Sequence, residues 1–114
     1  MFSFFSSNVP EIDSSEVKKA LDAKQDIILL DVRTPMEYEK TKINGSINFS
    51  IENITNQKAI ESIMPNKNAT IYVYCLSGSR SNAAVQRMIA YGYTNVFSMK
   101  NGLLAWRMKR YPLV

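Results

Sequence analysis

The chain has 114 residues, 46% of them hydrophobic, which is enough for one hydrophobic core, so we expect a single domain over 1–114. One cysteine and no histidine exclude an intrachain disulfide, a multi-cysteine zinc site and imidazole-based catalysis, and we expect no metal and no cofactor. The net charge of +4 favours small anionic substrates or acidic partner surfaces, while the dispersed basic residues argue against a nucleic-acid partner.

We expect no export signal at the beginning of the chain. The opening Met1–Phe5 is apolar, but it is shorter than the core of a signal peptide and follows no positive charge. No stretch approaches the roughly 20 apolar residues of a membrane helix, since even Ile27–Leu30 lies between Asp26 and Asp31. The sequence therefore predicts a cytoplasmic protein without membrane contact, and a monomer.

The first elements expected along the chain are a helix and a buried strand. Asp13 followed by Glu16 resembles a capping box, which predicts a helix over 14–23. The continuous apolar run 27–30 is typical of a central parallel strand covered on both faces, and Asp31 marks its carboxyl end.

Shorter elements are expected between this strand and a second buried one. Thr34–Pro35 is typical of an N-cap and a first helical position, which predicts a short helix to about Glu39. The segment 45–48 predicts a short strand. Apolar residues recur at mostly helical spacing and stop before a proline; they are Ile51, Ile54, Ile60, Ile63 and Met64. The apolar run 70–74 then predicts the second buried strand.

The last third of the chain predicts two helices around a short strand. We expect a helix over about 80–91 that ends at Gly92, a strand at 96–97 and a helix over 103–108. The inner face of the first helix is expected to carry Ala84, Val85, Met88 and Ile89. Core anchors of the second are expected among Leu104, Trp106 and Met108. Alternating strands and helices predict an α/β domain with a parallel sheet.

Cys75 is the candidate nucleophile. It follows the 70–74 strand and precedes the small polar loop Leu76–Ser81, which opens the next helix. Reactive groups in open α/β sheets collect at the carboxyl ends of the strands, where helix N-termini direct partial positive charge. We therefore expect the loop amides to surround the sulfur and favour its thiolate, with Arg80 adding a fixed charge and Gly78 a positive φ.

The alternative is that Cys75 is a buried structural residue at a strand end. The loop argues against this, because five polar or flexible residues in succession cannot pack against apolar neighbours. The loop serines are small enough to leave a pocket open, and they can donate hydroxyl hydrogen bonds. They are Ser77, Ser79 and Ser81.

Four segments extend over most of the chain: Asp31–Tyr38, Ile43–Asn48, Tyr74–Ser81 and Asn101–Trp106. In this order and spacing they resemble the rhodanese family. The resemblance implies a five-stranded, mainly parallel sheet with helices on both faces. It also implies a sulfurtransferase of the thiosulfate sulfurtransferase type. Such an enzyme takes sulfane sulfur onto a cysteine as a persulfide and passes it to a thiophilic acceptor such as cyanide, a thiol or a protein.

The resemblance also implies roles for single residues, with Cys75 as the sulfur carrier. The backbone amides that would cradle its persulfide belong to Leu76, Ser77, Gly78, Ser79 and Arg80. Arg80 would also steer a small anionic donor such as thiosulfate. Asp31, Arg33 and Ser81 would support the loop from behind, and for Arg33 the alternative is an ordinary surface ion pair.

Two positions depart from the family pattern. Lys42 stands where many relatives have a histidine, and Asn101 stands where they have a second glycine. Neither position is the nucleophile. We therefore expect them to affect loop packing or the identity of a partner and to leave sulfur transfer intact.

Two other functions compete with sulfur transfer. Related phosphatases and arsenate reductases place five residues between the cysteine and arginine of such a loop, whereas four separate Cys75 from Arg80, which favours a loop sized for sulfur. Inactive rhodanese-like domains act as protein-binding modules, but they commonly lose the cysteine that this chain keeps. A partner protein that donates or accepts sulfur is compatible with an active enzyme.

Overall fold

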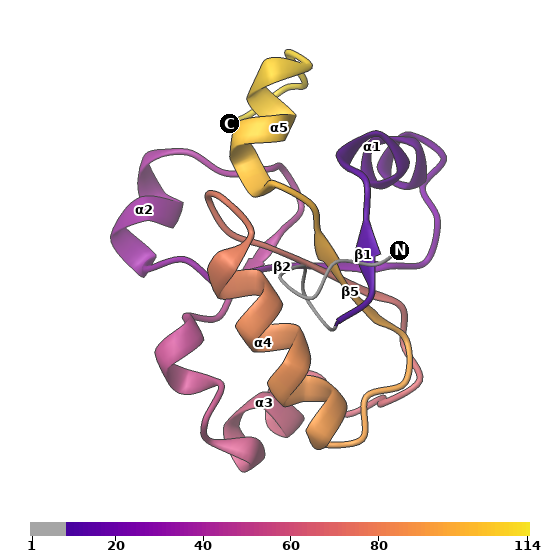
Figure 1. The fold of residues 1–114 in the computed structure, drawn as a ribbon, viewed down its shortest axis with the longest axis vertical. Coiled ribbons are helices and arrows are strands. Elements are labelled where there is room, and N and C mark those ends of the chain that lie inside the picture. Colours follow the sequence, from indigo (N-terminus) through magenta and orange to yellow (C-terminus); the bar gives the residue numbers. More distant parts are fainter. Residues whose placement is uncertain (1–8) are drawn as a thin grey trace.

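The computed structural model describes residues 9–114, so the apolar opening Met1–Phe5 lies outside the described residues. The strands of this part are β1 (Glu11–Ile12), β2 (Ile28–Asp31), β3 (Ile47–Asn48), β4 (Ile71–Tyr74) and β5 (Val96–Met99). They form one sheet in the order β1-β5-β4-β2-β3, and each neighbouring pair is parallel (Figure 1). The predicted five-stranded sheet is confirmed.

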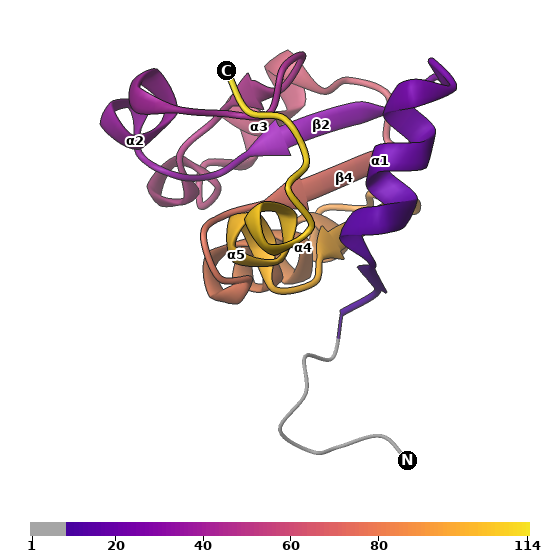
Figure 2. The same cartoon turned by 90° about the horizontal axis from the view of Figure 1, so that it is seen from above.

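Helices cover both faces of the sheet, as predicted. They are α1 (Ser14–Asp22), α2 (Pro35–Lys40), the 3-10 helix η1 (Ile51–Asn53), α3 (Gln57–Ile63), α4 (Ser79–Ala90) and α5 (Gly102–Met108). One face is covered by α1 and α5 and the other by α3 and α4 (Figures 1 and 2). Within residues 9–114, no helix combines the length and the apolar character needed to cross a membrane.

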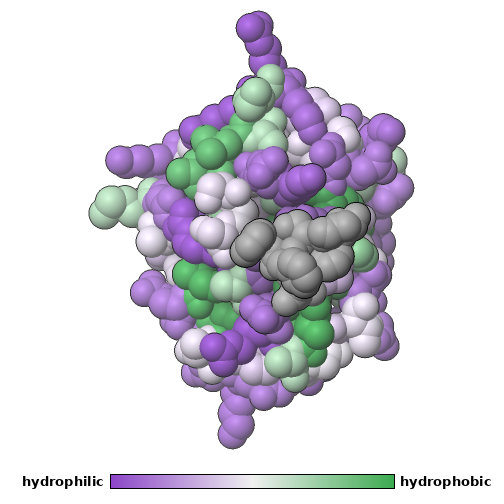
Figure 3. Space-filling view, viewed as in Figure 1, coloured by the Kyte–Doolittle hydropathy of each residue, from purple (hydrophilic) through white to green (hydrophobic). Residues whose placement is uncertain are grey.

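Neighbouring residues of the central strands pack into opposite core layers. Leu29 packs in the layer that contains Trp106, whereas Leu30 packs in the layer that contains Val73 and Met88. Successive strand residues point to opposite faces, so a strand buried on both faces is apolar throughout. On the molecular face seen in Figure 3, hydrophilic residues predominate and hydrophobic ones form small separate groups.

Ile89, which we expected on the inner face of its helix, and two of the three candidate core anchors of α5 are exposed. Ile89 is 43% exposed, Leu104 49% and Met108 85%, whereas Trp106 is buried as predicted. Leu104 and Met108 lie one turn apart on the outer side of α5. Ile89 lies beyond the edge of the buried stripe of α4, which includes Met88. The prediction was wrong at these positions because each helix buries only a narrow stripe, and several apolar residues fall outside it.

The beginning of the described chain also differs from the prediction. β1 was not predicted, because two residues are too few to produce an alternating pattern. Asp13 caps α1, but its carboxylate accepts from the N–H of Ser15 at 2.9 Å. Glu16 instead pairs with Lys19, so the predicted capping box at this helix is wrong.

Candidate active site

Cys75 directly follows β4 at the carboxyl edge of the sheet, and its side chain is buried. The backbone N–H of Gly78 donates to its Sγ at 3.1 Å, and that of Ser81 donates at 3.4 Å. The sulfur therefore lies at the N-terminus of α4, a 12-residue helix that begins at Ser79. N–H groups and a helix N-terminus directed at one atom stabilise negative charge on that atom.

Gly78 turns the loop back toward the sulfur. Its φ is 107°, in the left-handed region that residues with a Cβ rarely adopt. A Cβ at this position would lie 3.4 Å from the backbone nitrogen of Asn101, an ordinary contact distance, so it is the positive φ that favours glycine here. The positive φ that we expected at Gly78 is confirmed.

Buried hydroxyl groups lie next to the sulfur. The Cys75 thiol donates to Ser81 Oγ at 3.7 Å, and Ser81 Oγ lies 2.7 Å from the Oγ of Ser98 on β5. Ser98 is fully buried, and no feature of the sequence pattern singled it out. Ser77 and Ser79 differ, because both are exposed and their hydroxyl groups lie 3.5 Å from each other.

The start of α5 holds the loop from behind. The N–H of Leu103 donates to the carbonyl of Cys75 at 3.0 Å, and the N–H of Leu104 donates to the carbonyl of Leu76 at 3.1 Å. Gly102 permits this approach because it has no side chain. A Cβ at this position would lie only 2.4 Å from the Cys75 carbonyl oxygen. This support was not predicted, although a glycine at the start of a helix was the available signal.

The two residues that depart from the family pattern are both accommodated in the structure. Asn101 has a φ of 59°, a left-handed conformation that asparagine adopts more readily than most residues, so it can replace a glycine there. The Lys42 ammonium lies 4.9 Å from the centre of the Tyr38 ring, where it makes a cation–π contact.

Arg80 is bonded to a carboxylate that we did not predict. Its Nη1 and Nη2 donate to Oε1 and Oε2 of Glu37 at 2.7 and 3.1 Å. Glu37 also accepts from Thr34, and the two residues form a capping box at the start of α2. The Arg80 guanidinium, helped by Thr34, lowers the pKa of Glu37 to about 2. The same ion pair raises the pKa of Arg80 above its ordinary value.

Asp31 and Arg33 form an ion pair at the end of β2. Arg33 Nη2 lies 2.7 Å from Asp31 Oδ2, and the side chains are 4% and 0% exposed, so this is not the surface pair considered above. Arg33 also donates to the carbonyl of Thr41 at 2.6 Å, and its own carbonyl accepts from Asn48 and Ser50. The pair therefore holds the connection between β2 and α2, the helix that carries the Arg80 partner.

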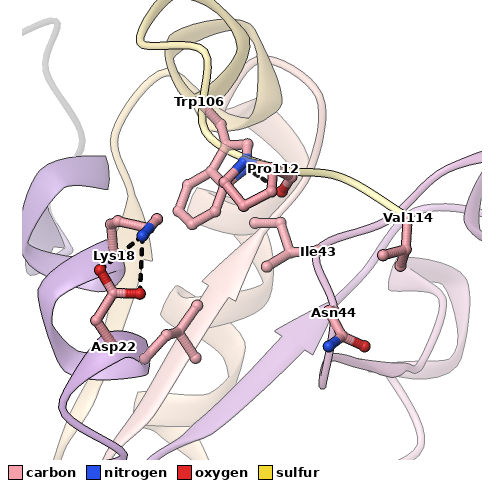
Figure 4. Close-up of a pocket in the computed structure, with 8 residues that line it drawn as sticks. Lys18, Asp22, Ile43, Asn44, Trp106, Pro112 and Val114 are labelled. Carbon is pink, nitrogen blue, oxygen red and sulfur yellow. Dashed lines mark hydrogen bonds and ion pairs between the residues drawn. The ribbon is translucent and has the colours of Figure 1, made fainter.

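A pocket of about 350 Å³ lies between α1, α5 and the C-terminal segment, and none of its lining residues belongs to the 75–81 loop (Figure 4). Lys18 and Asp22 on its wall pair with each other at 2.6 Å. Trp106 Nε1 donates to the carbonyl of Pro112 at 2.9 Å. The Lys18–Asp22 pair and the Trp106 N–H are thus already engaged within the protein.

Comparison with known proteins agrees with this geometry. The family model of the rhodanese-like domain matches residues 13–109. A sulfurtransferase of Allochromatium vinosum is 31% identical over 106 residues, which cover 93% of this chain and 95% of that protein. The thiosulfate sulfurtransferase PspE of Escherichia coli is 34% identical over 67 residues, which cover 59% of this chain and 62% of that protein.

A solved structure shares the same fold. The rhodanese-like domain of the Alr3790 protein from Anabaena matches with a TM-score of 0.82 and 27% identity, over 92% of this chain and 78% of that one. The sulfurtransferase relatives support a role in sulfur transfer. The family match, the relatives and the fold together show that the chain belongs to the rhodanese-like domain family.

Proposed function

We propose that this protein is a sulfurtransferase that carries sulfane sulfur as a persulfide on Cys75. The observation that supports this most directly is the environment of the sulfur, at which the N–H groups of Gly78 and Ser81 point from the start of α4. A nucleophilic sulfur needs stabilisation of its negative charge, and these groups supply it without histidine.

Transfer takes place in two half-reactions at the sulfur. The Cys75 thiolate attacks the outer sulfur of the donor, and the S–S bond of the donor breaks. The electron pair leaves with the rest of the donor, which is sulfite when the donor is thiosulfate. A thiophilic acceptor then attacks the outer sulfur of the Cys75 persulfide, and Cys75 leaves as a thiolate.

The fixed surroundings of the loop lower the cost of this chemistry. The N–H groups of Leu103 and Leu104 hold the carbonyls of Cys75 and Leu76, so the loop amides stay directed at the sulfur during both steps. Donors that are aligned before the reaction stabilise developing charge without reorganisation. A small anion and a protein persulfide present the same outer sulfur, so both are candidate donors.

The test is the formation of thiocyanate from cyanide and a sulfane-sulfur donor, either thiosulfate or a persulfide. We expect turnover by the wild type and only the uncatalysed rate for Cys75→Ser, with the thermal unfolding of the variant nearly unchanged. Full turnover by Cys75→Ser would contradict the proposal. A wild type that is inactive with every donor would favour a protein-binding module, and hydrolysis of a small phosphoester would favour a phosphatase.

A further inference from the structure

The ion pair of Glu37 and Arg80 joins the sulfur loop to α2, and its side chains form or break no bond in the two half-reactions. Arg80 is the second residue of α4 and Glu37 is the third residue of α2, so the pair bridges two helices. Both terminal nitrogens of the guanidinium bond to the two carboxylate oxygens, at 2.7 and 3.1 Å. This paired geometry is a strong form of ion pair, and it matches the charge of Arg80 with one carboxylate.

Glu37 is held in place independently of Arg80. Its Oε1 accepts from the N–H of Thr34 at 3.0 Å and from the hydroxyl of Thr34 at 3.1 Å. The Glu37 N–H in turn donates to Thr34 Oγ1 at 3.2 Å. The buried pair of Asp31 and Arg33 fixes the segment just before this helix. The carboxylate is therefore part of the α2 framework and is directed at the guanidinium.

Two ion pairs lie next to the sulfur, and each is neutral as a whole. Glu37 neutralises Arg80, and Asp31 neutralises Arg33. The Cys75 thiolate that attacks a donor adds one negative charge. A dianion such as thiosulfate thus meets no net positive charge from these groups, and the thiolate repels it more strongly than it repels a donor of lower charge. Both side chains of the Glu37 pair are about one third exposed, so an approaching donor can reach them.

We propose that Glu37 is a specificity-determining residue that neutralises Arg80 and thereby shifts the preference of the Cys75 site from thiosulfate toward persulfides on uncharged carriers. This inference rests on the proposed sulfur transfer and deepens it by naming the class of donor. In the reaction, the Cys75 thiolate attacks the outer sulfur of the persulfide. The carrier leaves as a thiolate with the electron pair of the broken S–S bond, and the outer sulfur keeps its proton.

The experiment measures the rate of persulfide formation on Cys75 from two donors, thiosulfate and the persulfide of 2-mercaptoethanol. The informative variant is Glu37→Gln, because glutamine removes the charge and can still accept the capping hydrogen bond from Thr34. We expect kcat/KM for thiosulfate to rise about five- to tenfold, the Coulomb effect of one unit charge on a nearby dianion in water. The gain should lie in KM, and the rate with the persulfide should change less than about twofold.

Two controls separate this effect from a structural one. Glu39→Gln changes the net charge equally at an exposed position of the same helix, and it should leave the ratio of the two donors unchanged. In the double variant Glu37→Gln/Arg80→Met the gain for thiosulfate should disappear, because the effect acts through the guanidinium. The gain in the single variant should also shrink in about 1 M salt, where charges are screened within about 3 Å.

The outcomes distinguish the two proposals. Suppose that the wild type forms the persulfide but Glu37→Gln changes kcat/KM for both donors by the same factor, or for neither donor. The role of Glu37 is then overturned, and sulfur transfer stands. A gain that survives in the double variant also overturns it. If neither donor loads Cys75 in the wild type, the proposed function fails and the specificity inference fails with it.

Discussion

Asp31 and Arg33 are charged residues with almost no exposure to water, at 0% and 4% of their side-chain surface. In the Asp31→Asn variant the guanidinium would be buried without a negative partner. The loss of one partner of a buried pair costs about 3–5 kcal/mol, and we expect the free energy of unfolding in urea to fall by that amount. The matched control is Asp22→Asn, which breaks the more exposed pair with Lys18 and should cost less than about 1 kcal/mol. Equal losses would show that the buried pair has no special role.

Glu37 makes the stability of the fold depend on pH. Its hydrogen bonds with Arg80 lower its pKa to about 2 from an ordinary value of 4.5. The unfolded chain therefore takes up the proton at a higher pH than the native protein does, so this stabilisation is complete above pH 4.5 and is lost as the pH falls toward 2. As the pH is lowered from 4.5 toward 2, the midpoint of thermal unfolding should fall less for Glu37→Gln than for the control Glu39→Gln. If the unfolding midpoints of the two variants fell in parallel with pH, this would contradict the lowered pKa of Glu37.

At the residue scale, the sequence predicted the groups that lie close together along the chain. Cys75 and Gly78 belong to one short loop, so their relation followed from spacing and backbone preferences. Glu37 and Ser98 were missed, because their partners Arg80 and Ser81 lie 43 and 17 residues away and local patterns do not encode such contacts.

At the element scale, the start of α5 makes a specific prediction about glycine. In Gly102→Ala, the new Cβ would lie 2.4 Å from the Cys75 carbonyl oxygen at a φ of 49°. We expect a loss of about 3 kcal/mol in the free energy of unfolding, together with loss of sulfur transfer. Asn101→Gly is the neighbouring control, because it relieves a left-handed asparagine and should stabilise by up to about 1 kcal/mol. A fully active and stable Gly102→Ala would show that α5 does not position the loop.

The elements themselves were predicted unevenly, for a physical reason. β2 and β4 were recognisable because strands that are buried on both faces are apolar throughout. The two residues of β1 leave no such pattern, and that strand exists because it pairs with β5. The exposed Leu104 and Met108 show that composition alone does not say which side of a short helix faces the core.

At the scale of the whole molecule, the order of the strands assembles the site. β2 and β4 are neighbours in a parallel sheet, so their carboxyl ends lie at one edge. α2 follows the first of them and α4 the second, which brings Glu37 and Arg80 together although they are 43 residues apart. The fold class could be predicted from the alternation of strands and helices. The order of the strands was not predicted, because neighbours in the sheet need not be neighbours in the sequence.

The most direct test of the whole account is intact-protein mass spectrometry of the wild type and Cys75→Ser. Each protein is incubated with thiosulfate or with the persulfide of 2-mercaptoethanol, and a second sample is then treated with cyanide. We predict that the wild type gains the mass of one sulfur atom, that cyanide removes it, and that Cys75→Ser gains none. An unchanged wild-type mass with both donors, or an equal gain by Cys75→Ser, would contradict a sulfur carrier at Cys75.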